Sequence, residues 1–308
     1  MQGSLIFICL FLDLFLKDPL RLPHPVQAIG VIISFLERMT LRFQFNYWVS
    51  GLISVLGLSL GIAWGINVLV NLKQFGWIFW LYFGYAGLAL GSLLREGQKV
   101  LHALGQNDLT LARKQLGFLV SRETDSLNQT EVVKALIETL AENFNDGFVA
   151  PFFYLFLGGP AWLWVYKTVS TFDSMWGYKH AHYSQLGWAG AKLDDLLAFL
   201  PARLTAFIFY LGGRALGQKI ELSKVAKQAR EMASPNAGWP MAAMALFLEV
   251  ELGGESTYFG KKVKKPKLGR AGVLPTVKDV ERCLGLLYLS WGIIVNLSAI
   301  FWGITFLM

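Results

Sequence analysis

Long apolar runs constrain this 308-residue chain more than any other feature of its sequence. Hydrophobic residues make up 54% of the chain and charged residues only 16%, which is too apolar for an ordinary soluble domain. Three runs are each close to the length of about 20 residues that crosses the hydrocarbon core of a bilayer. They are Tyr47 to Asn71, Phe75 to Leu94 and Cys283 to Met308, and we interpret them as membrane spans.

Three further apolar runs carry interruptions, so each fits a span, a half-span or an interfacial helix. The run Gln2 to Leu16 is short and contains Asp13. It has no basic segment before it, so we expect an anchor rather than a cleaved signal peptide. The other two are Pro151 to Val169, which contains Gly158-Gly159-Pro160, and Leu196 to Leu211, which contains Pro201 and Arg203.

The distribution of Lys and Arg predicts an orientation. If every run crosses, loops 17–46, 95–147 and 214–282 share one side and hold 23 of the 28 basic residues. Such loops face the cytoplasm, so we expect a multi-pass protein of the cell inner (plasma) membrane. The tract Lys261 to Arg270 fits this bias, or a lipid or phosphate contact, better than a nucleic-acid site. No nucleic-acid partner is expected.

No repeat or low-complexity linker divides the sequence. We therefore predict a single membrane-embedded unit, 1–308, with extramembrane loops 17–46, 95–147, 167–195 and 214–282. Strand signals are poor, whereas Leu127 to Asn145 has a helical apolar stripe and a capping-box pattern, and Glu221 to Met232 also fits a helix. The predicted class is an all-α, polytopic integral membrane protein with helical cytoplasmic loops and broken or re-entrant segments.

Two polar constellations are candidates for chemistry. Glu138 and Glu142 project from one helix face with Asp146 just beyond, a pattern that suits Mg²⁺ but is also common on solvated helices. The second lies in 167–203, where polar groups near a bilayer usually have a function. Its members are Asp173, Tyr178, Lys179, His180, His182, Lys192, Asp194, Asp195 and Arg203.

Simpler interpretations account for part of these two constellations. Asp194 and Asp195 fit equally well as caps of a helix beginning near Leu196. His180 and His182 alone supply too few ligands for zinc. No complete phosphate-loop, zinc-protease or hydrolase motif is present, so the spacing of residues alone does not identify a reaction.

Six segments, taken in order, resemble the CobD/CbiB family of adenosylcobinamide-phosphate synthases. They are DLFLKDPLRLPHPV (Asp13 to Val26), ETLAENFNDGFVAPFFY (Glu138 to Tyr154), STFDSMWGY (Ser170 to Tyr178), LGWAGAKLDDLLAFLPARLTA (Leu186 to Ala206), SPNAGWPMAAMA (Ser234 to Ala245) and LGG...YFG (Leu252 to Gly260). The sequence departs from the family pattern at three positions. Ser170 stands where Asn is expected, Lys192 where Arg is expected and Met241 where Glu is expected.

The resemblance implies a membrane ligase that uses ATP and Mg²⁺ as substrate and activator, with no tightly bound prosthetic group. It would join adenosylcobyric acid, a corrinoid, to (R)-1-amino-2-propanol O-phosphate or ethanolamine phosphate through an amide. The expected partners are these substrates, the lipid bilayer and other membrane proteins of cobalamin biosynthesis.

The resemblance also suggests roles for individual residues. The catalytic candidates are Glu138, Glu142, Asp173, Asp194 and Asp195. The metal candidates are Glu138, Glu142 and Asp146, with Asp173, Asp194 and Asp195 as alternatives. Substrate-binding candidates are Arg122, Lys192 and Arg203 for phosphate, Asn143, Asn145 and Asn236 for corrinoid amides, Tyr178, and His24. His24, which lies between two prolines, fits either a base or a structural turn.

A simple crossing topology would place 167–195 outside, whereas ATP is inside. Because both flanking runs are interrupted, we expect them to enter the membrane and return, which would bring Glu138, Asp173 and Asp194 to one cytoplasmic face. Two other functions fit the same scaffold. Broken helices with charged ends are typical of transporters, and a non-catalytic sensor is the third interpretation.

Overall fold

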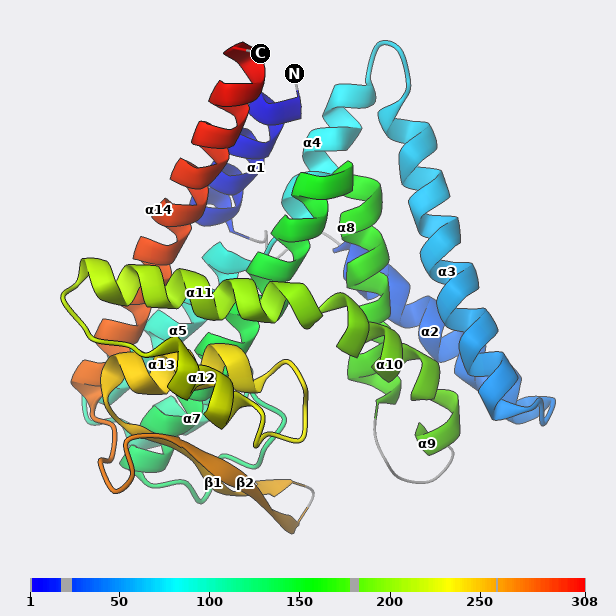
Figure 1. The fold of residues 1–308 in the computed structure, drawn as a ribbon. Helices are drawn as coiled ribbons and strands as arrows, with labels where there is room; N and C mark the ends of the chain where they lie inside the picture. The colour runs from blue at the N-terminus through cyan, green and yellow to red at the C-terminus, as the bar shows by residue number, and fades with distance from the viewer. Residues whose placement is uncertain (1, 18–23, 178–182, 259, 308) are drawn as a thin grey trace. The chain divides into compact units, whose positions relative to one another are not determined.

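The computed structural model describes residues 2–17, 24–177, 183–258 and 260–307, and these are mostly helical (Figure 1). The chain forms two compact units, each built from two separate stretches of sequence. Unit 1 comprises Met1–Ala89 and Asp146–Phe199, and unit 2 comprises Leu90–Asn145 and Leu200–Met308. The predicted helical, polytopic class is confirmed.

Unit 1 is helical throughout its described residues. Its elements are α1 (Gln2–Leu16), α2 (Pro25–Arg42), α3 (Tyr47–Val70), α4 (Gly76–Ala86), the π-helical turn η1 (Asn145–Val149) at its boundary, α8 (Ala150–Trp176), α9 (Tyr183–Leu186) and α10 (Trp188–Leu197). His24 is the N-cap of α2, because its Nδ1 accepts the Val26 N–H at 3.2 Å and Pro25 fills the first helical position. The structural role of His24 is thereby confirmed, and its role as a base stays a prediction.

Unit 2 combines helices with one β-hairpin. Its elements are α5 (Leu90–Gly105), α6 (Leu109–Leu116), α7 (Gln129–Phe144), α11 (Phe199–Ala215), α12 (Leu222–Ala229), α13 (Gly238–Leu248), β1 (Glu251–Tyr258), β2 (Lys261–Gly269) and α14 (Val277–Leu307). Helix α7 begins with the predicted capping box, in which Asn128 and Glu131 each accept the other's backbone N–H. Helix α12 confirms the second predicted helix.

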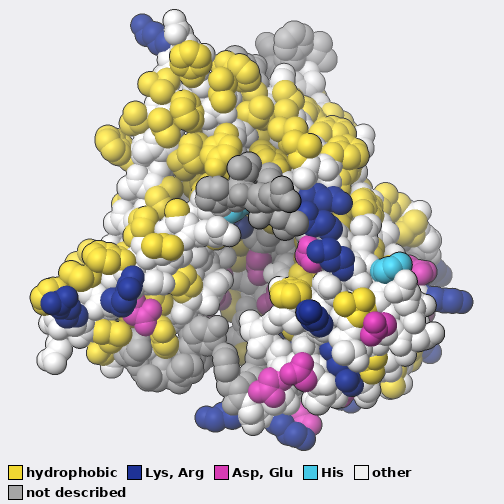
Figure 2. Space-filling view, turned by 180° about the vertical axis from the view of Figure 1, so that it is seen from behind, with side chains coloured by type: hydrophobic (Ala, Val, Ile, Leu, Met, Phe, Trp, Pro, Cys, Tyr) yellow, Lys and Arg dark blue, Asp and Glu magenta, His cyan; other side chains and the backbone are white. Residues whose placement is uncertain are grey.

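Four helical stretches of the described residues are long and apolar enough to cross a bilayer. They are Tyr47–Val70, Gly76–Gly105, Gln129–Trp176 and Val277–Ile304, and α10 with α11 adds a fifth if this pair, bent by 42°, is one span. Figure 2 shows hydrophobic side chains gathered over one region of the visible face, with most charged side chains elsewhere. In unit 2, α11 runs crosswise to α14 in Figure 1, which fits an interfacial helix better than a second crossing.

Helix α8 reverses direction at the predicted break. Gly159 has φ +69° and ψ −166°, a conformation that is essentially restricted to glycine, and Gly158 is also non-helical. Beyond the break the chain returns beside its first arm: the rings of Tyr154 and Tyr166 stack 5.4 Å apart, whereas 12 residues of straight helix span about 18 Å. The Tyr166 hydroxyl also reaches the Asp146 carbonyl at 3.5 Å. The two arms meet at their upper ends in Figure 1.

This reversal makes α8 a hairpin, a shape that fits the predicted re-entrant path. Residues 145–157 rise only about 20 Å as a helix, which is short of the roughly 30 Å of a hydrocarbon core. The hairpin packs against α2, α3 and α10 of its own unit. Asp146 and Asp173 therefore both lie at the open end of the hairpin, away from its turn.

The β-hairpin of unit 2 was not predicted from the sequence. Its strands pair antiparallel from Glu251 opposite Gly269 to Tyr258 opposite Lys261, with a register shift between Gly253 and Gly254. Gly253 has φ +80°, and a Cβ there would lie 2.0 Å from the Pro266 carbonyl oxygen. A glycine is therefore required where the two strands approach most closely.

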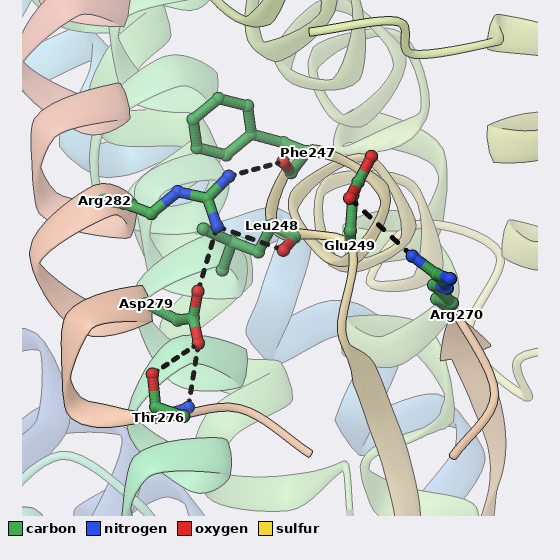
Figure 3. Close-up of polar contacts among 7 residues, drawn as sticks. All are labelled: Phe247, Leu248, Glu249, Arg270, Thr276, Asp279 and Arg282. Atoms are coloured by element: carbon green, nitrogen blue, oxygen red, sulfur yellow. Dashed lines mark hydrogen bonds and ion pairs between the residues drawn. The ribbon is translucent and has the colours of Figure 1, made fainter. Parts of the chain in front are cut away.

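Helix α14 is fastened to α13 through Arg282 (Figure 3). Its guanidinium donates to the carbonyls of Phe247 at 3.3 Å and Leu248 at 3.2 Å, the last residues of α13, and pairs with Asp279 at 3.0 Å. Asp279 in turn accepts the N–H of Thr276 at 2.8 Å, just before α14. A cation at a helix C-terminus interacts favourably with the helix dipole, so this contact stabilises the junction between α13 and α14.

Candidate functional site

The open end of the α8 hairpin gathers carboxylates in unit 1. Asp146 lies before the first arm, Asp173 lies near the end of the second, and α10 contributes Asp194 and Asp195. Helices α8 and α10 pack closely, because a Cβ at Gly190 would lie 3.1 Å from the Phe172 Cβ. Asp194, one turn further along α10, is within electrostatic range of the other three aspartates.

Asp194 is the central group of this acidic cluster, which we define as Asp146, Asp173, Asp194 and Asp195. The Ser170 side chain lies near the Asp194 carboxylate. The Oδ1 atom of this carboxylate is nevertheless buried with no hydrogen-bond partner among the described residues. A buried acceptor without a partner costs about 1–3 kcal/mol, and nearby like charges add repulsion. The cluster is therefore suited to a cation or a hydrogen-bond donor supplied by a ligand.

The positions of Asp194 and Asp195 exclude the simpler interpretation. Both lie inside α10, which ends at Leu197 with Ala198 as its C-cap. The interpretation of these residues as N-caps of a helix beginning near Leu196 is therefore wrong.

Among the described residues no group of three or more His, Cys, Asp or Glu side chains is arranged to hold a metal ion by itself. Mg²⁺ commonly uses one or two carboxylates together with substrate phosphates, so the metal assignments stay predictions.

Glu138, in unit 2, has a well-defined structural contact. Its Oε2 pairs with the Arg122 guanidinium at 2.6 Å, and its Oε1 accepts the Gly253 N–H at 2.7 Å. Arg122 also donates to the Ser256 hydroxyl at 3.2 Å. Glu138 is 2% exposed, so this buried pair fastens the β-hairpin to α7. Both Glu138 oxygens are thus already engaged by the protein.

Glu142, one turn further along α7, is half-buried. It lies within electrostatic range of Lys265 on β2, and of Glu138 and Arg122. Among the described residues of unit 2, Glu142 is not part of a group of three or more side chains that could hold a metal ion. Glu142 therefore has both positive and negative side chains nearby. This environment is compatible with a ligand-binding role, which stays a prediction.

The remaining predicted residues lie in several places. Asn143 donates to the Thr139 hydroxyl at 2.9 Å within α7, whereas the buried Asn145 accepts the Thr205 hydroxyl at 2.8 Å and so joins the end of α7 to α11. Lys192 is exposed on α10 of unit 1. Arg203 donates to Asn236 at 3.3 Å and lies over the Trp239 ring. Tyr178, with Lys179, His180 and His182, lies outside the described residues.

Two acidic residues that sequence reasoning missed have clear structural roles. Glu251 accepts the Gly272 N–H at 2.9 Å and pairs with Lys267 at 3.0 Å. The backbone hydrogen bond, with Lys267, lowers the pKa of the Glu251 carboxyl below its usual value. Glu37 on α2 accepts the Tyr183 hydroxyl at 2.7 Å and the Trp176 indole N–H at 3.3 Å, so it fixes the end of α8. Their partners are distant in sequence, and no local pattern predicts them.

Comparison with known proteins decides the family. The family described as CobD/Cbib protein matches residues 6–287. The chain belongs to the CobD/CbiB family of cobalamin biosynthesis proteins. It is 39% identical over 295 residues to the cobalamin biosynthesis protein CobD of Listeria monocytogenes, covering 91% of each chain. It is 38% identical to CobD of Streptococcus sanguinis, covering 92% of each chain. It is 36% identical to the cobalamin biosynthesis protein CbiB of Salmonella typhi, covering 91% of each.

Family membership sets the context for the acidic cluster. Ser170, which stands where the resemblance leads us to expect Asn, lies near the Asp194 carboxylate. A hydroxyl and an amide can both donate a hydrogen bond, so either side chain could serve this carboxylate. No solved structure matches the chain.

Proposed function

We propose that this CobD/CbiB protein forms adenosylcobinamide phosphate by ATP-dependent amide ligation. The substrates would be adenosylcobyric acid and (R)-1-amino-2-propanol O-phosphate or ethanolamine phosphate. The observation that carries the proposal is the acidic cluster at the open end of the α8 hairpin, with the buried, unpartnered Oδ1 of Asp194. Support also comes from the family of the chain.

The chemistry of amide formation explains why carboxylates are needed. A carboxylate is a poor electrophile, so ATP would first convert the corrinoid acid to an acyl phosphate, and the amine would then displace phosphate from the acyl carbon to form the amide. The attacking amine must also lose a proton, and a carboxylate of the acidic cluster would accept it.

The donor atoms of the acidic cluster fit Mg²⁺, which prefers carboxylate oxygens together with phosphates. Asp194 has a buried oxygen without a partner, and Asp146 and Asp173 lie within electrostatic range of it. One or two of these carboxylates would hold the ion together with phosphate oxygens of the substrate. When bound, Mg²⁺ would neutralise charge on the phosphates of ATP.

A product assay tests the proposal directly. Purified protein in detergent is incubated with ATP, Mg²⁺, adenosylcobyric acid and either amino-alcohol phosphate, and the corrinoid is followed by mass spectrometry. We expect a mass gain equal to one amide condensation, and none without ATP. Folded protein that gives no gain with either amine would refute the ligase. The α8 hairpin also resembles a transporter's broken helix, and flux of corrinoid without product would favour that function.

We further propose that the open end of the α8 hairpin faces the cytoplasm, where ATP is available. Gln185 is exposed on α9 of the same unit, and the two native cysteines, Cys9 and Cys283, are buried. A Gln185→Cys variant in intact cells should resist a membrane-impermeant thiol reagent and become labelled after the cells are opened. A cysteine in place of Lys73, between α3 and α4, is the control for external labelling. Labelling of residue 185 from outside would contradict this orientation.

A further inference from the structure

Two adjoining pockets lie along α3 beside the turn of the α8 hairpin, and all their lining residues belong to unit 1. The first, which we call the turn pocket, has a volume of about 400 Å³ and is lined by Trp80 and by the break at Gly159. The second, the side pocket, has a volume of about 670 Å³ and is lined by Trp64 and Trp162. Both volumes are within the range of about 300–1,000 Å³ that is usual for ligand sites. The pockets share three lining residues, which are Asn67, Gly158 and Ala161.

Trp80 presents a hydrogen-bond donor to the turn pocket. Its side chain is only 7% exposed, and its indole N–H makes no hydrogen bond with any residue that the structure describes. The Nε1 atom lies 3.4 Å from the place that a Cβ of Gly159 would occupy, so the donor faces the non-helical turn of α8. A buried indole N–H usually has a partner, because an unpaired donor is unfavourable. A ligand that carries an acceptor would satisfy it.

The side-chain amide of Asn67 adds a second donor where the two pockets meet. Its carbonyl side, Oδ1, accepts the side-chain N–H of Asn71 at 3.2 Å. Its own NH₂ group makes no hydrogen bond with the part of the chain that the structure describes. No charged side chain is among the described residues that line either pocket. The lining therefore suits uncharged or ester-type oxygen acceptors and does not select a ligand by its net charge.

The polarity of the two pockets changes along α3 in the way that it changes along a phospholipid. The turn pocket lies at the last turn of this span, which ends at Val70, and beside the first turn of α4, where Trp77 is 52% exposed. Tryptophan is enriched at the boundary between membrane and water. The side pocket extends along the same span to Leu60, and this length of helix rises about 15 Å from Val70. The donors thus lie at the end of the span, and the apolar walls lie further into it.

We propose that the turn pocket and the side pocket together bind one membrane phospholipid. The Trp80 indole and the Asn67 amide donate to its ester or phosphate oxygens, and one acyl chain lies in the side pocket against Trp64 and Trp162. The lipid thereby joins the turn of α8 to α3 and α4. The inference does not rest on the proposed ligase, because these pockets lie at the turn of the hairpin whereas the acidic cluster lies at its open end.

Native mass spectrometry of the full chain tests the site without requiring turnover. Delipidated protein in detergent is titrated with dioleoylphosphatidylethanolamine, a zwitterionic lipid that exposed lysines do not attract by net charge. We expect the wild-type protein to bind one molecule saturably. Trp80→Phe keeps an aromatic ring and removes the N–H, so the dissociation constant should rise about 3-fold to 10-fold, the effect of one hydrogen bond. Ala161→Phe places a ring in both pockets and should abolish saturable binding.

A matched control and a competing ligand define the outcomes. Trp48→Phe makes the same substitution at the start of α3, outside both pocket linings, and should bind the lipid as the wild-type protein does. Added lipid should raise the melting temperature of the wild-type protein, and by less in Trp80→Phe. Equal lipid binding by the wild-type protein, Trp80→Phe and Ala161→Phe would overturn the site. Saturable binding of adenosylcobyric acid that Trp80→Phe weakens, without any lipid binding, would assign the pockets to the corrinoid and also overturn it.

Discussion

Asparagine in place of Asp194 is expected to reduce amide formation by at least about 100-fold, the lower range for losing a positioned acid, base or charge-stabilising group. The side chains have the same shape, so the packing of α10 against α8 should persist. The substitution also removes one negative charge from four neighbouring aspartates, so the melting temperature should stay the same or rise. Product formation followed by mass spectrometry and thermal unfolding in detergent measure the two effects.

Comparison variants show whether this effect is specific to the acidic cluster. Asp125→Asn changes an exposed aspartate of unit 2 and should leave both activity and stability unchanged. Ser170→Asn introduces the residue that the resemblance leads us to expect and should retain activity, because an amide can also donate a hydrogen bond to a carboxylate. Wild-type activity in Asp194→Asn would exclude this carboxylate from the reaction. Lost activity accompanied by a lower melting temperature would mean that Asp194 acts through the fold.

Alanine in place of Glu138 is expected to lower the free energy of unfolding of unit 2 by about 3–5 kcal/mol, the usual effect of breaking a buried ion pair from one side. The variant leaves Arg122 buried without its carboxylate and the Gly253 N–H without its acceptor. The β-hairpin should therefore separate from α7. Thermal unfolding and the rate at which trypsin cleaves the lysine-rich strand β2 report this change.

Glu255→Ala supplies the control on the same hairpin. Its ion pair with Lys262, at 3.4 Å, joins two exposed side chains, so its loss should change stability by less than about 1 kcal/mol. Equal melting temperatures and equal cleavage rates for Glu138→Ala and wild type would show that the buried pair does not hold the hairpin. Glu138→Gln should fall between the two, because its oxygen can still accept one of the hydrogen bonds.

Apolar length and helix-breaking residues predicted most of the helical fold. The runs that form α3 and α14 are long and apolar, and Gly158-Gly159-Pro160 marked the place where α8 breaks. Local sequence could not show that the second arm returns beside the first, because that depends on contacts such as Tyr154 with Tyr166. From the sequence, a re-entrant path followed only from the expectation that 167–195 lies on the same side of the membrane as ATP.

The sequence predicted which residues belong to the candidate site better than it predicted how they are arranged. Asp173 and Asp194 were named, and the structure places them within electrostatic range of each other. Glu138 and Glu142 looked equivalent on one helix face, yet only Glu138 binds Arg122 and Gly253. The hairpin that carries Gly253 was missed because the lysines and the proline of β2 are poor strand formers.

The returning path of α8 also bears on how the protein is made. A segment that spanned the bilayer would have to carry Lys167 or Asp173 through the hydrocarbon during insertion, at about 2.5–3.5 kcal/mol for each charge at the centre. A hairpin that enters and leaves on one side avoids this transfer. Its turn, however, leaves backbone groups at Gly158 and Gly159 outside any helix, and these need protein around them. Helices α3 and α4 are synthesised first, so the ribosome delivers α8 to a partly assembled bundle that can shelter its turn.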